Sequence, residues 1–199
     1  MKFDDAALMR LRELVGKRPA IAIDAPQYRR ACVLIPLVRV DGAWSILFLR
    51  RSANLAAHSG QIAFPGGAVE DGESYADAAV RETHEEVGIA PERVELIGRL
   101  DDLITNVSGF LVAPFVGVIH ERVEYVLQAS EVDEVFEVPV DALLTPSQPE
   151  VRYVDYRGSS YPAYFYPFGA HEIWGLTGRM LKTFLDLVWQ CLRGSGLDF

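Results

Sequence analysis

A single helix with clearly marked ends constrains this chain more than any other feature of its sequence. Ser74 with Asp77 three residues later matches a helix-capping pattern, and Gly88 supplies the left-handed residue that often ends a helix. We therefore predict a helix over 74–87. Its apolar sector predicts the face that packs on the core, Ala76, Val80, Thr83 and Val87, and the opposite sector holds Glu82, Glu85 and Glu86.

The three glutamates are neighbours on one helical surface because they are three and four residues apart. Like charges at this spacing destabilise a helix by roughly 0.2–0.5 kcal/mol per pair. The helix dipole adds to that cost, since it disfavours anions near the C-terminal end. A divalent cation between the carboxylates would remove the repulsion, because hard cations such as Mg²⁺ take oxygen ligands. A solvated acidic face is the alternative, and the three residues alone leave both open.

The residues around the glutamates favour the metal site. The segment 67–89 resembles the Nudix box at these positions: Gly67, Glu73, Arg81, Glu82, Glu85, Glu86, Gly88 and Ile89. The one departure is Thr83, where the box usually has a larger apolar residue. This resemblance implies an α+β fold, an α/β/α sandwich around a mixed sheet, and a hydrolase that uses Mg²⁺ or Mn²⁺. It also implies the metal ligands, which are Glu82, Glu86, Glu85 and the carbonyl of Gly67.

The resemblance assigns further roles. Arg81 and Glu73 would form a brace that orients the ligands, as residues behind a metal site do. Metal ions polarise a diphosphate and lower the pKa of a bound water, so one carboxylate must accept a proton. Glu86 is one candidate for this base. The acids downstream are others, with Glu131 preferred over Glu134, although either is equally an exposed loop acid.

The loop before the box narrows the substrate. Its residues resemble the signature of coenzyme A pyrophosphatases, except at Leu49, where that signature has threonine; the matching residues are Arg51, Ser52, Leu55, His58, Gly60, Gln61 and 64–67. The resemblance implies hydrolysis of coenzyme A to 3′,5′-ADP and 4′-phosphopantetheine. The substrate-binding candidates are Arg51, His58, Gln61 and Arg50. Solvated strand-end arginines and a structural histidine are the alternatives.

Two other functions stay open. The chain could be a Nudix hydrolase of another nucleoside diphosphate derivative, such as ADP-ribose, a dinucleotide or an oxidised nucleotide. It could also be a nucleotide-binding regulatory module without activity, although such modules usually have eroded metal ligands.

Composition excludes some partners. The net charge of −9 argues against a nucleic-acid polymer, which a basic face normally binds. No apolar run approaches the roughly 18 residues of a membrane span. Cys32 and Cys191 lie in apolar runs and are expected as buried thiols. We expect a cytoplasmic protein with one domain over 1–199, either a monomer or a homodimer.

The remaining elements follow from periodicity and turn residues. We predict helices at about 4–17 and 172–192, a helical turn at 139–144, and strands at 30–40, 44–50, 94–100, 110–119, 134–138, 151–157 and 161–166. Residues 52–71 are expected to form a long loop, which is unusual unless it has a function. The aromatic residues near the C-terminus are expected in the core: Tyr161, Tyr164, Tyr166 and Trp174.

Overall fold

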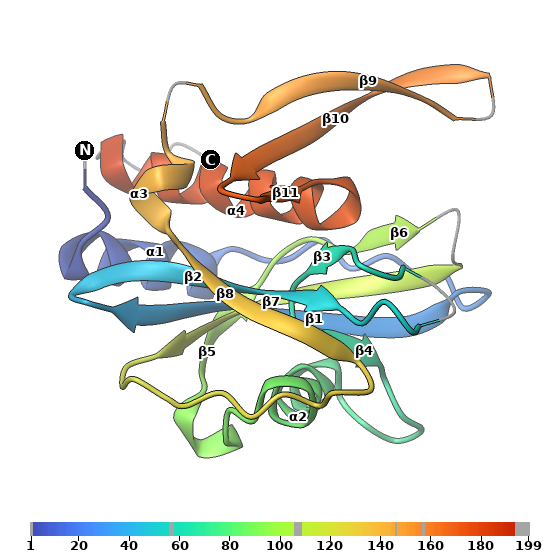
Figure 1. Ribbon diagram of the computed structural model, residues 1–199, viewed down its shortest axis with the longest axis horizontal. Helices are drawn as coiled ribbons and strands as arrows, with labels where there is room; N and C mark the ends of the chain where they lie inside the picture. Colours follow the sequence, from blue (N-terminus) through green and yellow to red (C-terminus); the bar gives the residue numbers. More distant parts are fainter. Residues whose placement is uncertain (1, 56–57, 106–108, 146, 157, 194–199) are drawn as a thin grey trace.

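The computed structural model describes residues 2–55, 58–105, 109–145, 147–156 and 158–193. A mixed β-sheet lies between helices, with α1 and α4 on one face and α2 on the other (Figure 1). The predicted α+β sandwich is therefore confirmed. The elements are α1 (Asp5–Lys17), β1 (Arg29–Val40), β2 (Ala43–Arg51), β3 (Ile62–Ala63), β4 (Gly66–Ala68), α2 (Tyr75–Val87), η1 (Pro91–Arg93), β5 (Glu95–Arg99), β6 (Leu103–Thr105), β7 (Phe110–Ile119), β8 (Val132–Pro139), α3 (Val140–Leu143), β9 (Glu150–Tyr156), β10 (Ser159–Phe168), β11 (His171–Ile173) and α4 (Gly175–Arg193).

The sheet is built around β1. It runs parallel to β7 over ten residue pairs and forms an antiparallel hairpin with β2 through the predicted turn at Asp41 and Gly42. The short β4 pairs antiparallel with β1, and β8 pairs antiparallel with β2. As a result, the end of β2, the start of β8 and the start of the box lie at one end of the sheet.

Two layers of apolar side chains hold the sandwich together. The larger cluster packs α1 and α4 on one face of the sheet, and includes Leu11, Phe48, Tyr166 and Phe184. Smaller clusters lie on the other face, where Ala78, Ala79 and Val87 of α2 pack on strand residues. Helix α2 is therefore fixed to the sheet along its length, which gives the box carboxylates a rigid support.

The predicted core face of α2 is wrong in part. Thr83 and Val87 are buried as expected, but Ala76 and Val80 are only partly buried, and Glu86 has a side chain only 2 % exposed. The sector analysis of the helix assigns all three glutamates to the solvent side. Here the chain at Gly66 and Gly67 lies against the glutamate side of the helix and covers it.

The loop predicted over 52–71 contains two short strands, β3 and β4, and a third unpredicted strand, β6, follows β5. Each has only two or three residues, too few for a period of two to be visible in sequence. They exist because they pair with β2, β1 and β7. Residues 62–63 and 66–68 of the long loop are therefore part of the sheet.

The C-terminal part forms a second, three-stranded sheet with order β11-β10-β9, which lies over α4 (Figure 1). The predicted hairpin at 151–166 is present, and Arg157 lies outside the described residues. The last helix begins at Gly175, because residues 171–173 pair as β11.

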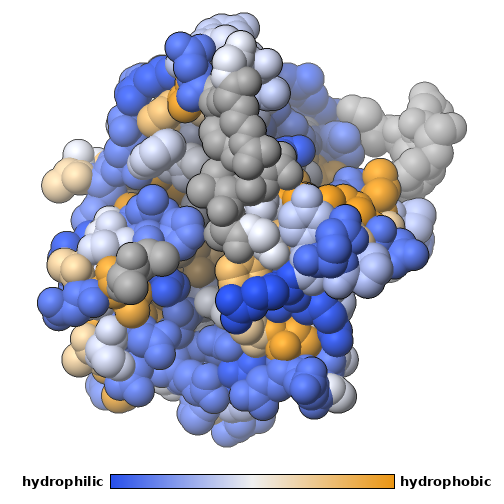
Figure 2. Space-filling model, turned by 90° about the vertical axis from the view of Figure 1, so that its right-hand side faces the viewer, coloured by the Kyte–Doolittle hydropathy of each residue, from blue (hydrophilic) through white to orange (hydrophobic). Residues whose placement is uncertain are grey.

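Two of the four aromatic residues expected in the core do not lie there. Tyr166 is fully buried and Tyr164 packs against the core, but Tyr161 is 53 % exposed and Trp174 45 % exposed. The hairpin extends past the core, so alternation along it does not alternate burial. The face in Figure 2 is largely hydrophilic, with hydrophobic residues in separate patches. Within the described residues, no helix is long and apolar enough to cross a membrane.

Candidate metal and diphosphate site

The site is built where the Gly66–Gly67 turn lies against helix α2. The backbone N–H of Gly66 donates a hydrogen bond of 2.9 Å to Oε2 of Glu86. Burial raises the pKa of Glu86 to about 8; the Gly66 N–H and Arg51 lower it, and the charges of Glu82 and Glu131 raise it further. A buried carboxylate with one backbone donor and an arginine 3.7 Å away, beyond hydrogen-bond distance, is an incompletely compensated anion.

Gly67 brings a second carboxylate to the same turn. A Cβ atom at Gly67 would lie 2.4 Å from the carboxylate of Glu82, so only glycine leaves room for it. Burial also raises the pKa of Glu82, more than the bond from Arg81 lowers it. Two consecutive glycines therefore contact two carboxylates that are one helical turn apart. The sequence motif indicated Gly67, but the N–H contact of Gly66 was not predicted.

Arg81 connects the loop to the helix. Its guanidinium donates to both oxygens of Glu73 at 2.8 and 3.1 Å, to Glu82 at 2.9 Å and to the carbonyl of Ala68 at 3.1 Å. The bonds from Arg81 lower the pKa of Glu73. This arrangement fits the predicted brace, since it fixes the direction of Glu82 relative to the turn.

Glu85 lies at the edge of the site. It is 55 % exposed, and its carboxylate accepts a 2.9 Å bond from Arg81. Within the described residues, no three acidic, histidine or cysteine side chains are arranged to hold one ion. The role of Glu85 as a third metal ligand therefore stays a prediction.

Arg51 and Glu131 approach the carboxylates from outside the box. Nη1 of Arg51 lies 3.7 Å from Oε1 of Glu86, and its Nε is buried without a hydrogen-bond partner in the described part of the chain. Glu131 is exposed, and its backbone carbonyl accepts the N–H of Ser52 at 2.8 Å. Since its charge raises the pKa of both Glu82 and Glu86, it lies within electrostatic range of them.

The other sequence candidates lie farther out. His58 and Gln61 bond each other at 3.0 Å and are exposed. Arg50 points to the opposite face of the sheet, where its Nε donates to Glu134 at 3.0 Å. Glu134 lies beside Phe136 in the α4-side layer, so the structure does not bring it to Glu86.

The residues at this turn fit a divalent metal ion. Mg²⁺ is usually bound by one or two carboxylates, with substrate phosphates and water completing its coordination. Glu82 and Glu86 supply the two carboxylates, and the Gly67 carbonyl lies beside them, 3.8 Å from the Cys32 thiol. A cation here would compensate two carboxylates whose burial disfavours their charge.

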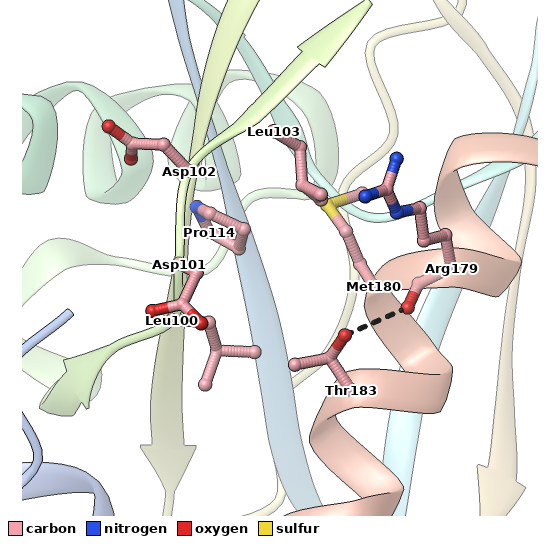
Figure 3. Close-up of a pocket in the computed structure, with 8 residues that line it drawn as sticks. All are labelled: Leu100, Asp101, Asp102, Leu103, Pro114, Arg179, Met180 and Thr183. Atoms are coloured by element: carbon pink, nitrogen blue, oxygen red, sulfur yellow. Dashed lines mark hydrogen bonds between the residues drawn. The ribbon is translucent and has the colours of Figure 1, made fainter. Parts of the chain in front are cut away.

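The described residues also form cavities away from this turn. One of about 160 Å³ lies between α4 and the chain leading to β6, with Arg179 and Met180 facing Leu103 (Figure 3). A second, of about 560 Å³, lies beside Tyr125 and Arg122. Neither is lined by a box residue.

The fold and this site define a Nudix protein, and the comparisons agree. The NUDIX domain family matches residues 28–157, well over half of the chain, so the chain belongs to this family. Nudix hydrolase 3 of Caenorhabditis elegans is 36 % identical over 189 residues, covering 87 % of this chain and 79 % of that protein. The uncharacterized Nudix hydrolase NudL of Enterobacter sp. (strain 638) is 38 % identical over 166 residues, covering 83 % of this chain and 85 % of that protein.

A solved structure has the same fold. The Nudix hydrolase RenU of M. smegmatis superposes with a TM-score of 0.50 at 22 % identity, covering 58 % of this chain and 73 % of that one. The protein is thus a Nudix hydrolase in sequence and in fold.

The buried carboxylate predicts a pH dependence of stability. Glu86 has a pKa of about 8 in the folded, metal-free protein and about 4.3 when unfolded. Its contribution to stability is fully present below about pH 4.3 and is lost as the pH rises through about 8. We expect the Tm of the protein in chelator to fall over this range more than the Tm of Glu86→Gln. Equal slopes for the two proteins would contradict the raised pKa.

Proposed function

We propose that this Nudix hydrolase is a divalent-metal-dependent diphosphatase that hydrolyses coenzyme A, or a derivative of it, to 3′,5′-ADP and 4′-phosphopantetheine. The observation that carries the proposal is the meeting of Glu82, Glu86 and Gly67 at one turn, with Arg51 beside Glu86. This places paired carboxylates next to an arginine with an unused donor.

The protein's own groups have distinct tasks in this proposal. Glu82 and Glu86, with the Gly67 carbonyl, hold Mg²⁺ or Mn²⁺, and Arg81 with Glu73 orients Glu82. When bound, the ion neutralises phosphate charge and lowers the pKa of an attacking water. Glu131 accepts the proton of that water, because it is the exposed acid whose charge reaches both ligands.

The substrate assignment rests on the loop before the box. The Arg51 side chain is 26 % exposed beside Glu86, and a guanidinium binds a phosphate through two parallel hydrogen bonds. The loop returns to this residue, since the Arg51 N–H donates to Gln61 and the Gly60 N–H donates to the Arg51 carbonyl, both at 3.0 Å. His58 and Gln61 are thereby held on the same loop and complete the proposed substrate contacts.

The test is product analysis of the purified protein with Mg²⁺ or Mn²⁺ on coenzyme A, ADP-ribose and NADH in parallel. We expect preferential cleavage of coenzyme A into 3′,5′-ADP and 4′-phosphopantetheine, and none in chelator. Preference for ADP-ribose or NADH would leave the metal site standing and overturn the substrate assignment. Binding of these ligands without cleavage would favour a regulatory module.

A further inference from the structure

The last two residues of β2 lie at a β-bulge. Arg50 is paired with Glu134 of β8, but Arg51 is paired with Val132, so Asp133 has no residue opposite it. A bulge bends its strand and changes the direction of nearby side chains. Here Arg50 lies on the face that carries α4, and Arg51 reaches Glu86 on the face that carries α2. The extra residue is Asp133 of β8, and Arg51 points away from Arg50 because successive strand residues alternate between faces.

Acidic residues of β8 hold this bulge in place. Nε of Arg50 donates to Oε2 of Glu134 at 3.0 Å, and its Nη1 lies 3.7 Å from Asp133. The N–H of Ala53 donates to the same Asp133 carboxylate at 3.1 Å. Residues on both sides of Arg51 are thus tied to β8, while Arg51 itself points away from these acids.

A histidine from the C-terminal sheet completes the arrangement. Nε2 of His171 lies 3.3 Å from Oε1 of Glu134, so both oxygens of that carboxylate are in use. The imidazole stacks on Phe136 with ring centroids 4.0 Å apart and planes 12° apart. Its side chain is only 20 % exposed. His171 is therefore held by two residues of β8 and has little freedom to move.

The ring stack continues toward the box. Phe136 stacks on Phe48 at 5.7 Å, and Phe48 stacks on Phe64 at 5.0 Å. Phe64 comes two residues before Gly66, whose N–H contacts Glu86. The C-terminal sheet thus contacts the site's supports by two routes, one through Glu134 and Arg50 and one through aromatic rings.

We propose that His171 is a positioning residue for the diphosphatase site. It contacts Glu134, which accepts a hydrogen bond from Arg50. Arg50, with Asp133, holds on β8 the end of β2 from which Arg51 points at Glu86. The inference rests on the proposed function in one respect: the proposed function gives Arg51 a substrate phosphate to bind.

A double-mutant cycle tests this coupling. In the wild-type background we expect His171→Asn to lower kcat/KM for coenzyme A by about 10-fold, mainly through KM. In an Arg51→Met background the same change should cost less than about 2-fold, because the residue it positions is gone. His171→Phe keeps the ring stack but loses the contact between Nε2 and Glu134, and should behave like His171→Asn.

The matched control is His120→Asn. His120 also has its Nε2 near a glutamate, 2.8 Å from Glu95, and an aromatic neighbour, Trp44. It should leave kcat/KM unchanged. Equal losses from His171→Asn in both backgrounds would show a merely structural role, and no loss in the wild-type background would also overturn the proposal.

A ligand-free measurement separates this inference from the proposed function. If the wild-type protein cleaves no diphosphate, the function fails, and crystal structures of the His171→Asn and His120→Asn variants decide the inference alone. We expect the Arg51 guanidinium to move away from Glu86 in the His171→Asn variant and to stay beside it in the His120→Asn variant. An unmoved Arg51 in His171→Asn would refute the positioning role.

Discussion

Glu86→Gln is expected to lower kcat by more than about 10²-fold, because Glu86 is a proposed metal ligand and loss of a group that merely supports a metal ligand already costs about 10–100-fold. Glu86 is the most buried carboxylate of the box and accepts the Gly66 N–H. The amide keeps the size of the side chain and can still accept that bond through its oxygen. It removes the negative charge that the ion requires.

Folding should survive this substitution. The pKa of Glu86 is raised by burial, so its charged form destabilises the metal-free protein, and a neutral amide removes that cost. We therefore expect an unchanged or higher Tm in chelator, with loss of the Tm increase that Mg²⁺ gives the wild type. Glu92→Gln makes the same chemical change at an exposed glutamate outside the site and should change neither quantity. A fully active Glu86→Gln enzyme would refute the metal-site assignment.

Helix α2 shows how far the sequence predicts such a site. Its start at Ser74 and its end at Gly88 follow from local capping chemistry, so they are visible without the fold. The box spacing likewise indicates Glu82 and Glu86. The burial of Glu86 does not follow, because it depends on a turn 20 residues earlier that lies against the helix.

The same limit applies to residues outside the box. Arg50 and Arg51 lie on opposite faces, as consecutive strand residues do, but only the packing of the sheet decides that Arg51 is the one beside Glu86. Glu131 and Glu134 were both candidates for the base, yet only Glu134 is bound by Arg50 and His171. These differences arise from pairing between strands about 80 residues apart, which periodicity along one strand does not describe.

Gly67→Ala is expected to lower kcat/KM by about 10²-fold while the protein stays folded. The new Cβ would lie 2.4 Å from the Glu82 carboxylate, so that group must move by about 1 Å to reach normal contact. A displacement of this size at a catalytic group can cost about 10²-fold in rate. The end of a glutamate side chain moves easily, so the fold loses little.

The neighbouring glycine provides the matched control. A Cβ at Gly66 would lie 2.2 Å from the carbonyl oxygen of Cys32 and 2.7 Å from the Cα of Val33, both backbone atoms of β1 that cannot move alone. Gly66→Ala should therefore lower Tm strongly, whereas Gly67→Ala should lower activity with little change in Tm, as thermal melting and initial rates will show. If Gly67→Ala kept full activity, Glu82 would not be needed at this turn. If the two variants lost activity only in proportion to Tm, the Gly-Gly pair would serve packing alone, and the metal would have to bind elsewhere.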